Sequence, residues 1–174
     1  MANIDSLLVY GRHLLEENPE IIAKRHIVCI DHNDIVTGDQ LIQLIKQHFP
    51  IVNEHNFTFE CKSKTNTEGF YMKPHVDDCQ IVSNTKKTEN LEKYIHVNDT
   101  KCLYHRNNLP IYTVLYYCSQ SKIDFTGGKL VFADGLQFEP VKGMFVFFDS
   151  REVHYVTPVK SGERTNWIVK MYIE

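Results

Sequence analysis

A histidine and an aspartate separated by one residue are the first pair in this sequence whose types and spacing could do chemistry. His75 and Asp77 lie in the segment Lys-Pro-His-Val-Asp-Asp. On a β-strand, alternate side chains point to the same face, so both residues could ligate one metal ion. An imidazole and a carboxylate suit a divalent first-row metal, and two histidines with one carboxylate leave coordination positions open for reactants. The pair therefore predicts a second histidine further along the chain.

His154 is the candidate for that second histidine, because it follows the apolar run Phe-Phe-Asp near the end of the chain. Arg164 follows ten residues later, after a Ser-Gly-Glu turn, and we expect a hairpin to bring it beside His154. An arginine there would point a planar fork of donors at a group near the metal. Taken singly, each residue is more typical of an ordinary core or surface position, so the order of the residues carries the prediction.

Length and composition favour one globular domain inside the cell. The chain has 174 residues, enough for a single hydrophobic core. Its net charge of -3 and pI near 6.3 disfavour a nucleic-acid partner. The N-terminus lacks a basic patch followed by an apolar core, and no apolar run approaches the roughly 20 residues of a membrane span, so we expect no signal peptide and no membrane helix. Five scattered cysteines without a Cys-x-x-Cys motif predict a reduced, cytoplasmic or otherwise intracellular protein.

Helices are expected early in the chain and strands afterwards. Apolar spacing predicts an amphipathic helix over residues 4–17, and Thr37 is placed to cap a second helix that ends before Pro50. Residues 62–68 are expected to form a turn, and residues 78–110 a long polar excursion with one short strand near 94–97. The expected strands are residues 26–31, 57–61, 69–77, 111–118, 129–133, 137–140, 144–148, 153–158 and 164–173.

Alternation along the last strand separates two faces. Arg164, Asn166, Ile168 and Lys170 share a mixed face that suits a cofactor pocket. The opposite, apolar face needs a cover, and the two N-terminal helices are the expected cover. On the strand of residues 111–118, Tyr117 lies inside if Arg164 does.

Four local motifs together with the His-x-Asp…His…Arg order resemble the Fe(II)/2-oxoglutarate dioxygenases, in particular their prolyl hydroxylase-like branch. The resemblance covers about residues 57–173. The motifs are Thr-x-Leu-x-Tyr at residues 113–117, Gly-Gly-x-x-x-Phe at 127–132, Pro-x-x-Gly at 140–143 and His-x-x-x-Pro-Val at 154–159.

This resemblance implies a mainly β fold with N-terminal helices: a double-stranded β-helix, jelly-roll or cupin-like, with two facing antiparallel sheets. It implies one domain over residues 1–174, in which residues 1–50 give helical support and residues 51–174 form the β-helix core. His75, Asp77 and His154 would be the catalytic Fe(II) ligands. Arg164, helped by Tyr117, would bind the co-substrate 2-oxoglutarate. Ascorbate is a candidate auxiliary reductant.

The implied activity is hydroxylation of a protein or peptide, at proline, with release of succinate and CO2. Two departures from the family pattern leave the substrate open: the excursion after Asp77 is long, and the anchoring residue is Arg164 where collagen-type prolyl hydroxylases carry lysine. Demethylation of a nucleic-acid base stays possible, because Arg164-Thr165-Asn166 resembles the Arg-x-Asn ending of the alkylated-base demethylases. Hydroxylation of a small molecule stays open as well, and so does a non-catalytic β-helix module that only binds metal.

Overall fold

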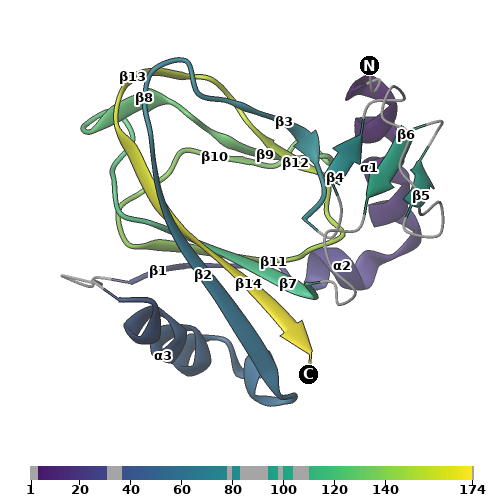
Figure 1. The fold of residues 1–174 in the computed structure, drawn as a ribbon, viewed down its shortest axis with the longest axis horizontal. Helices are drawn as coiled ribbons and strands as arrows, with labels where there is room; N and C mark the ends of the chain where they lie inside the picture. The colour runs from purple at the N-terminus through teal and green to yellow at the C-terminus, as the bar shows by residue number, and fades with distance from the viewer. Residues whose placement is uncertain are drawn as a thin grey trace.

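Two antiparallel sheets face each other across the interior of the protein (Figure 1). The larger sheet has the strand order β1-β11-β7-β14-β2, and the smaller has the order β10-β9-β12-β3. This computed structural model describes residues 4–30, 37–77, 80–82, 94–97, 100–103 and 110–173. The arrangement is the double-stranded β-helix that the sequence predicts.

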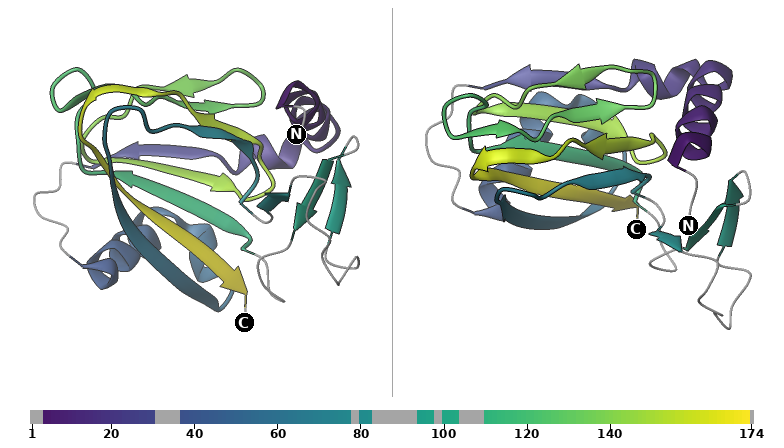
Figure 2. Two further views of the ribbon diagram at one scale, coloured as in Figure 1. Left: turned by 45° about the horizontal axis from the view of Figure 1, so that its top comes forward. Right: turned by 90° about the horizontal axis from the view of Figure 1, so that it is seen from above.

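The strands of the larger sheet are β1 (His26–Cys29), β11 (Met144–Asp149), β7 (Tyr112–Tyr117), β14 (Arg164–Ile173) and β2 (Phe57–Asn66). Those of the smaller sheet are β10 (Gln137–Phe138), β9 (Leu130–Phe132), β12 (His154–Val156) and β3 (Met72–His75). A two-stranded pair consists of β8 (Phe125–Gly127) and β13 (Val159–Gly162). A further small sheet consists of β4 (Gln80–Val82), β6 (Thr100–Leu103) and β5 (Tyr94–Val97), and Figure 2 shows it outside the two facing sheets.

The interior between the sheets is filled from both sides. Strands β7 and β11 are buried along their whole length, which explains their continuous apolar sequences. Their alternate side chains serve two separate cores, because successive residues point to opposite faces. The inner core, between the sheets, consists of Leu115, Tyr117, Leu130, Phe132, Met144, Val146 and Phe148.

Helix α3 (Gly38–His48) covers the outer face of the larger sheet. Its start is fixed by a capping box: the Gln40 amide donates to Thr37 Oγ1 at 3.2 Å, and the Thr37 amide donates to Gln40 Oε1 at 3.1 Å. Leu41 and Ile45 pack on the outer core with Val169, and the 3-10 helix η1 (Pro50–Asn53) follows. The predicted helical cover of the apolar face of β14 is therefore confirmed for α3.

Helix α1 (Ile4–Glu17) does not share in that cover, so the expectation that both helices cover the last strand is wrong. Leu7 on α1 packs against Val76, Ala133 and Val153, beside the smaller sheet. Gly11 allows this approach, because an added Cβ would lie 2.7 Å from Ala133 Cβ. Helix α2 (Pro19–Ala23) follows directly. Among the described residues, no helix combines the length and the apolar character that crossing a bilayer requires.

Three local expectations need correction. Residues 62–66 are not a turn: β2 continues to Asn66, because all ten residues pair with β14. The chain from His154 to Arg164 is not a hairpin, since β12 pairs with β3 and β9, whereas β14 pairs with β2 and β7. The intervening β13 pairs with β8. Within 78–110, β5 agrees with the expected strand and β4 and β6 were not expected; apart from Pro110, the remainder lies outside the described residues.

Candidate metal centre

The predicted triad comes from two neighbouring strands of the smaller sheet. His75 is the last residue of β3, and Asp77 follows it by two positions. His154 is the first residue of β12 and lies directly opposite His75 in the antiparallel register, with the two ring centroids 4.3 Å apart. The backbone amide of Asp77 donates to the Ser150 carbonyl at 3.1 Å, which ties it to the turn before β12. The strand pairing therefore brings together residues that are far apart in sequence.

Three potential ligand atoms converge on one point. Asp77 Oδ1 lies 3.6 Å from His75 Nε2 and 3.5 Å from His154 Nε2. One ligand atom from each of the three residues lies within 4.8 Å of the other two. The structure therefore brings all three predicted ligands together.

The second polar atom of each side chain is already bonded elsewhere. His75 Nδ1 lies 2.7 Å from the Lys73 carbonyl, and His154 Nδ1 lies 2.9 Å from the Glu152 carbonyl. A carbonyl only accepts, so both Nδ1 atoms donate a proton to it and both Nε2 atoms face the cluster. The Thr113 hydroxyl donates to Asp77 Oδ2 at 2.7 Å and leaves Oδ1 for the cluster. Such outer partners orient ligands in metal sites.

The charge states also suit a cation. Burial alone would raise the pKa of Asp77, but His154, the hydrogen bond and charge of His75, and Lys170 together hold it well below its usual range. Burial lowers the pKa of His154 to about 4, although Asp77 opposes that shift. At neutral pH the cluster therefore presents an ionised carboxylate and a neutral His154, the forms in which these side chains bind metals.

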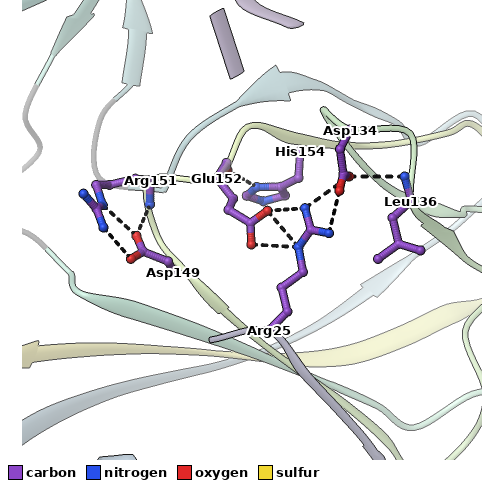
Figure 3. A network of polar contacts seen from close by, with 7 residues as sticks. All are labelled: Arg25, Asp134, Leu136, Asp149, Arg151, Glu152 and His154. Carbon is purple, nitrogen blue, oxygen red and sulfur yellow. Dashed lines mark hydrogen bonds and ion pairs between the residues drawn. The ribbon is translucent and has the colours of Figure 1, made fainter. Parts of the chain in front are cut away.

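A buried ion-pair network supports the backbone that holds His154 (Figure 3). The Arg25 guanidinium donates from Nε to Glu152 Oε1 at 2.8 Å and from Nη1 to Asp134 Oδ2 at 2.8 Å. Arg25 also lies 4.4 Å from the centre of the Phe132 ring, and the Glu152 side chain is fully buried. Burial raises the pKa of Glu152, and Arg25 offsets this only in part. The carbonyl of Glu152 is the one that fixes the His154 ring.

The turn before Glu152 is braced in the same way (Figure 3). Arg151 donates to Asp149 from Nε at 3.0 Å and from Nη2 at 2.9 Å, and the backbone amide of Glu152 donates to the Asp149 carbonyl at 3.1 Å. These contacts fix the chain between β11 and β12 on which the second histidine depends.

The predicted cofactor residues Arg164 and Tyr117 are also neighbours. Arg164 is 3% exposed and donates to the Gly128 carbonyl at 3.0 Å, to Asn166 Oδ1 at 3.0 Å and to the Tyr117 hydroxyl at 3.3 Å. Burial raises the pKa of Tyr117, although the Arg164 charge opposes it. Among the described residues, no carboxylate forms an ion pair with this guanidinium. A buried arginine without a counter-ion is costly, so the site is suited to an anion.

Several supporting residues were not assigned a role from sequence. Asn166 could have been found from its alternation with Arg164, and Thr113 from its place in the Thr-x-Leu-x-Tyr motif. Gly128 has a φ of 59°, and an added Cβ would lie 2.8 Å from Arg164 Cδ, which explains the Gly-Gly pair. Arg25 and Glu152 gave no local signal, because only the fold brings them together.

The donor set fits the iron of a 2-oxoglutarate-dependent oxygenase. Two imidazole nitrogens and one carboxylate oxygen meet at one point, and the remaining polar atoms of these side chains are hydrogen-bonded. This composition is the two-histidine, one-carboxylate set of non-haem Fe(II) sites. His75, Asp77 and His154 could therefore hold Fe(II).

Solved structures show the same fold at low sequence identity. The viral collagen prolyl hydroxylase of Paramecium bursaria Chlorella virus-1, as its 2-oxoglutarate complex, has a TM-score of 0.56 and 15% identity, over 96% of this chain and 90% of that chain. A Pseudomonas putida prolyl-4-hydroxylase has a TM-score of 0.53 and 18% identity, over 96% and 88%. HygX from Streptomyces hygroscopicus, with iron bound, has a TM-score of 0.51 and 9% identity, over 95% and 78%.

A family model gives the assignment that these structures leave open. No curated protein matches the sequence. The model of the 2OG-Fe(II) oxygenase superfamily matches residues 61–174, well over half of the chain and a range that includes His75, Asp77, His154 and Arg164. The family implies Fe(II) and 2-oxoglutarate as cofactor and co-substrate, in agreement with the donor set. The chain therefore belongs to the 2OG-Fe(II) oxygenase superfamily.

Proposed function

We propose that this protein is an Fe(II)- and 2-oxoglutarate-dependent dioxygenase that hydroxylates a protein or peptide at proline, and that it acts as a single domain. The observation that carries the proposal is the pairing of two sites in one interior. One is a preoriented His-Asp-His cluster, and the other is a buried arginine without a protein counter-ion among the described residues. A metal-binding module alone would not require the second site.

His75, Asp77 and His154 are assigned as the iron ligands. Their bonded Nδ1 and Oδ2 atoms orient the three remaining donor atoms toward one another, and three protein ligands would leave coordination positions of the iron for reactants. When bound, the iron supplies the oxidative chemistry by which O2 and 2-oxoglutarate become succinate, CO2 and a hydroxyl group on the substrate.

Arg164 and Tyr117 are assigned to the distal carboxylate of 2-oxoglutarate. The guanidinium is held by Gly128 and Asn166, which fixes its plane before any ligand arrives. A preoriented fork loses little entropy on binding a carboxylate and can bind both oxygens. The Tyr117 hydroxyl already accepts from Arg164, so its own proton is available to the same carboxylate.

Support for a proline substrate comes from the neighbouring structures and from the chemistry of the residue. Two of the structures with the same fold are named prolyl hydroxylases. Proline has a fixed φ, so a peptide that presents it in an extended form loses little conformational entropy on binding.

Succinate release with Fe(II), 2-oxoglutarate and a peptide panel centred on proline, lysine or asparagine tests the proposal. We expect stimulation by a proline peptide, and mass spectrometry should find one added oxygen atom in that peptide. Asp77→Asn is the inactive control. Stimulation by methylated single-stranded DNA or RNA, with no peptide product, would show that the substrate assignment is wrong and leave the iron and cofactor assignments standing.

A further inference from the structure

Three lysines lie on the inner side of the larger sheet, outside the residues assigned above. Strands β14 and β2 pair over their whole length, with Lys170 opposite Glu60, Ile168 opposite Lys62, and Asn166 opposite Lys64. Residues opposite each other in a strand pair point to the same face. These side chains therefore share the face of Arg164 and Asn166.

That face is the inner one. Arg164 and Asn166 are buried on it around Tyr117, and Ile168 packs against the inner core. The alternate residues of the same two strands pack against the outer core under α3: Phe57, Phe59, Cys61, Trp167, Val169 and Met171. Lys62, Lys64 and Lys170, named here the inner lysines, therefore project toward the side that contains the metal centre.

Lys170 is the inner lysine nearest the metal centre. It pairs in register with Thr113, whose hydroxyl binds Asp77. Its charge acts on both Asp77 and His154. Among the described residues, no carboxylate is close enough to its ammonium group for an ion pair. Lys170 lies six positions after Arg164, about 20 Å along a strand, so the two cations serve different ends of the site.

The other inner lysines extend this positive charge outward. Lys64 is exposed, and the Lys62 side chain is 64% exposed. Lys62 Nζ lies 3.3 Å from Oε1 of Glu60, the acidic residue on the same face of β2. Lys73 adds a further exposed cation on β3, two positions before His75. The local charge is therefore positive although the whole chain has a net charge of -3.

We propose that the inner lysines select a substrate with carboxylate groups beside the reacting residue, so that the preferred peptide is acidic. The inference rests on the proposed peptide hydroxylase function and specifies its substrate class. Lys170 binds the carboxylate nearest the reacting residue. Lys62 and Lys64 bind acidic groups further along the peptide, where 2-oxoglutarate does not extend.

Equilibrium binding of labelled proline peptides tests this inference without turnover. The peptides carry flanking aspartate, asparagine or lysine and are measured anaerobically with 2-oxoglutarate and Mn(II), by fluorescence anisotropy. We expect the aspartate peptide to bind about tenfold more tightly than the isosteric asparagine peptide, with the preference falling as salt rises. Lys170→Met and the double variant Lys62→Met/Lys64→Met should each reduce the preference.

Lys142→Met is the matched control, because this exposed lysine lies beside Cys118, on the outer side. It should leave the preference unchanged. Equal binding of the aspartate and asparagine peptides by the parent protein would overturn the inference. So would a Lys170→Met variant that needs more 2-oxoglutarate but keeps the peptide preference, because the lysine would then bind the co-substrate. Acidic peptides that bind preferentially but are never hydroxylated would support the inference and contradict the proposed function.

Discussion

Each triad side chain is oriented by a second contact, and this decides what the cluster can bind. The two carbonyls at Lys73 and Glu152 fix the histidine tautomers, and the Thr113 hydroxyl fixes the carboxylate. Two of these three partners are backbone atoms, which no side-chain substitution removes. Thr113 is therefore the outer contact that mutation can test most directly.

Thr113→Val should weaken divalent metal binding by about 10–100-fold, because the isosteric side chain removes the hydrogen bond to Asp77 Oδ2 without changing the packing volume. Isothermal titration with Mn(II) measures the effect. Thr65→Val is the control, since the Thr65 hydroxyl contacts Thr165 on the exposed edge. Unchanged affinity in Thr113→Val would mean that Asp77 is oriented by the backbone alone.

Arg164→Lys should raise the 2-oxoglutarate concentration needed for turnover while leaving metal affinity within a few-fold of the parent. A lysine keeps the charge but loses the fork held by Gly128 and Asn166, so part of a buried pairing worth about 2–5 kcal/mol is lost. Succinate release against 2-oxoglutarate concentration gives the result. Tyr117→Phe should show a smaller shift of the same kind, and an equal loss of metal affinity in either variant would argue against these roles.

The sequence predicted that His75, Asp77 and His154 come together, but it did not predict the contacts that support them. His75 and Asp77 share a face because alternate residues of a strand point the same way. The later positions of His154 and Arg164 match the order of these residues in the dioxygenase family. Glu152 and Arg25 could not be found in this way, because their pairing depends on packing between the N-terminal segment and the turn before β12.

At the level of elements, Arg25 connects the N-terminal helices to the smaller sheet, whose strands β3 and β12 carry His75 and His154. Arg25 lies between α2 and β1, and its partners Glu152 and Asp134 lie beside β12 and β9 (Figure 3). Nζ of the neighbouring residue Lys24 lies 3.9 Å from Asp149 Oδ2. The N-terminal segment is therefore part of the support of His154 as well as a cover.

Arg25→Met should destabilise the fold by about 3–5 kcal/mol, because it leaves the Glu152 carboxylate buried without its cation. Urea unfolding of the metal-free protein measures this. The double variant Arg25→Met/Glu152→Leu should recover much of the loss, since no buried charge remains. Arg12→Met, on the exposed side of α1, is the control. A double variant as unstable as the single one would show that packing, rather than charge, is the main contribution.

Gly11→Ala should cost about 1–3 kcal/mol, because its Cβ would overlap Ala133 and Val153 and push α1 away from the smaller sheet. Thermal unfolding gives the value. Gly135→Ala is not a fair control, because its φ is 91°; the control is Ala23→Ser on the exposed side of α2. Equal stability of Gly11→Ala and the parent would indicate that the helix can shift without loss.

The predictions that were wrong for β2, for the segment from His154 to Arg164 and for α1 have physical causes. Strand β2 appeared to be a turn after Cys61 because its inner residues are charged, but an edge strand with a polar inner face keeps its ladder to β14. The segment from His154 to Arg164 appeared to be a hairpin because it is short, yet β13 crosses between the sheets by pairing with β8. The position of α1 depends on Leu7 and Gly11 packing against Ala133 and Val153, which lie more than 100 residues away in the sequence.

For the molecule as a whole, family motifs were more informative than composition. The order and spacing of the motifs over residues 113–159 predicted the two-sheet barrel, which average composition and a mild net charge could not do. The same motifs are shared by enzymes with different substrates, so the substrate class has to be inferred from residues such as Lys170 that lie outside them.

The opposed position of His75 and His154 has a consequence for folding. A metal held by both histidines closes a loop of almost half the chain, much as a reversible cross-link would. Ligand that binds only the folded form stabilises it by mass action, by about 2.7 kcal/mol at 100 times Kd. Adding Mn(II) should therefore raise the melting temperature, and His154→Ala should abolish that dependence. Because proteolysis follows the population of open forms, protein whose metal has been removed by a chelator should also be digested faster. In a metal-poor cell, the copies that cannot react would then be the first to be degraded.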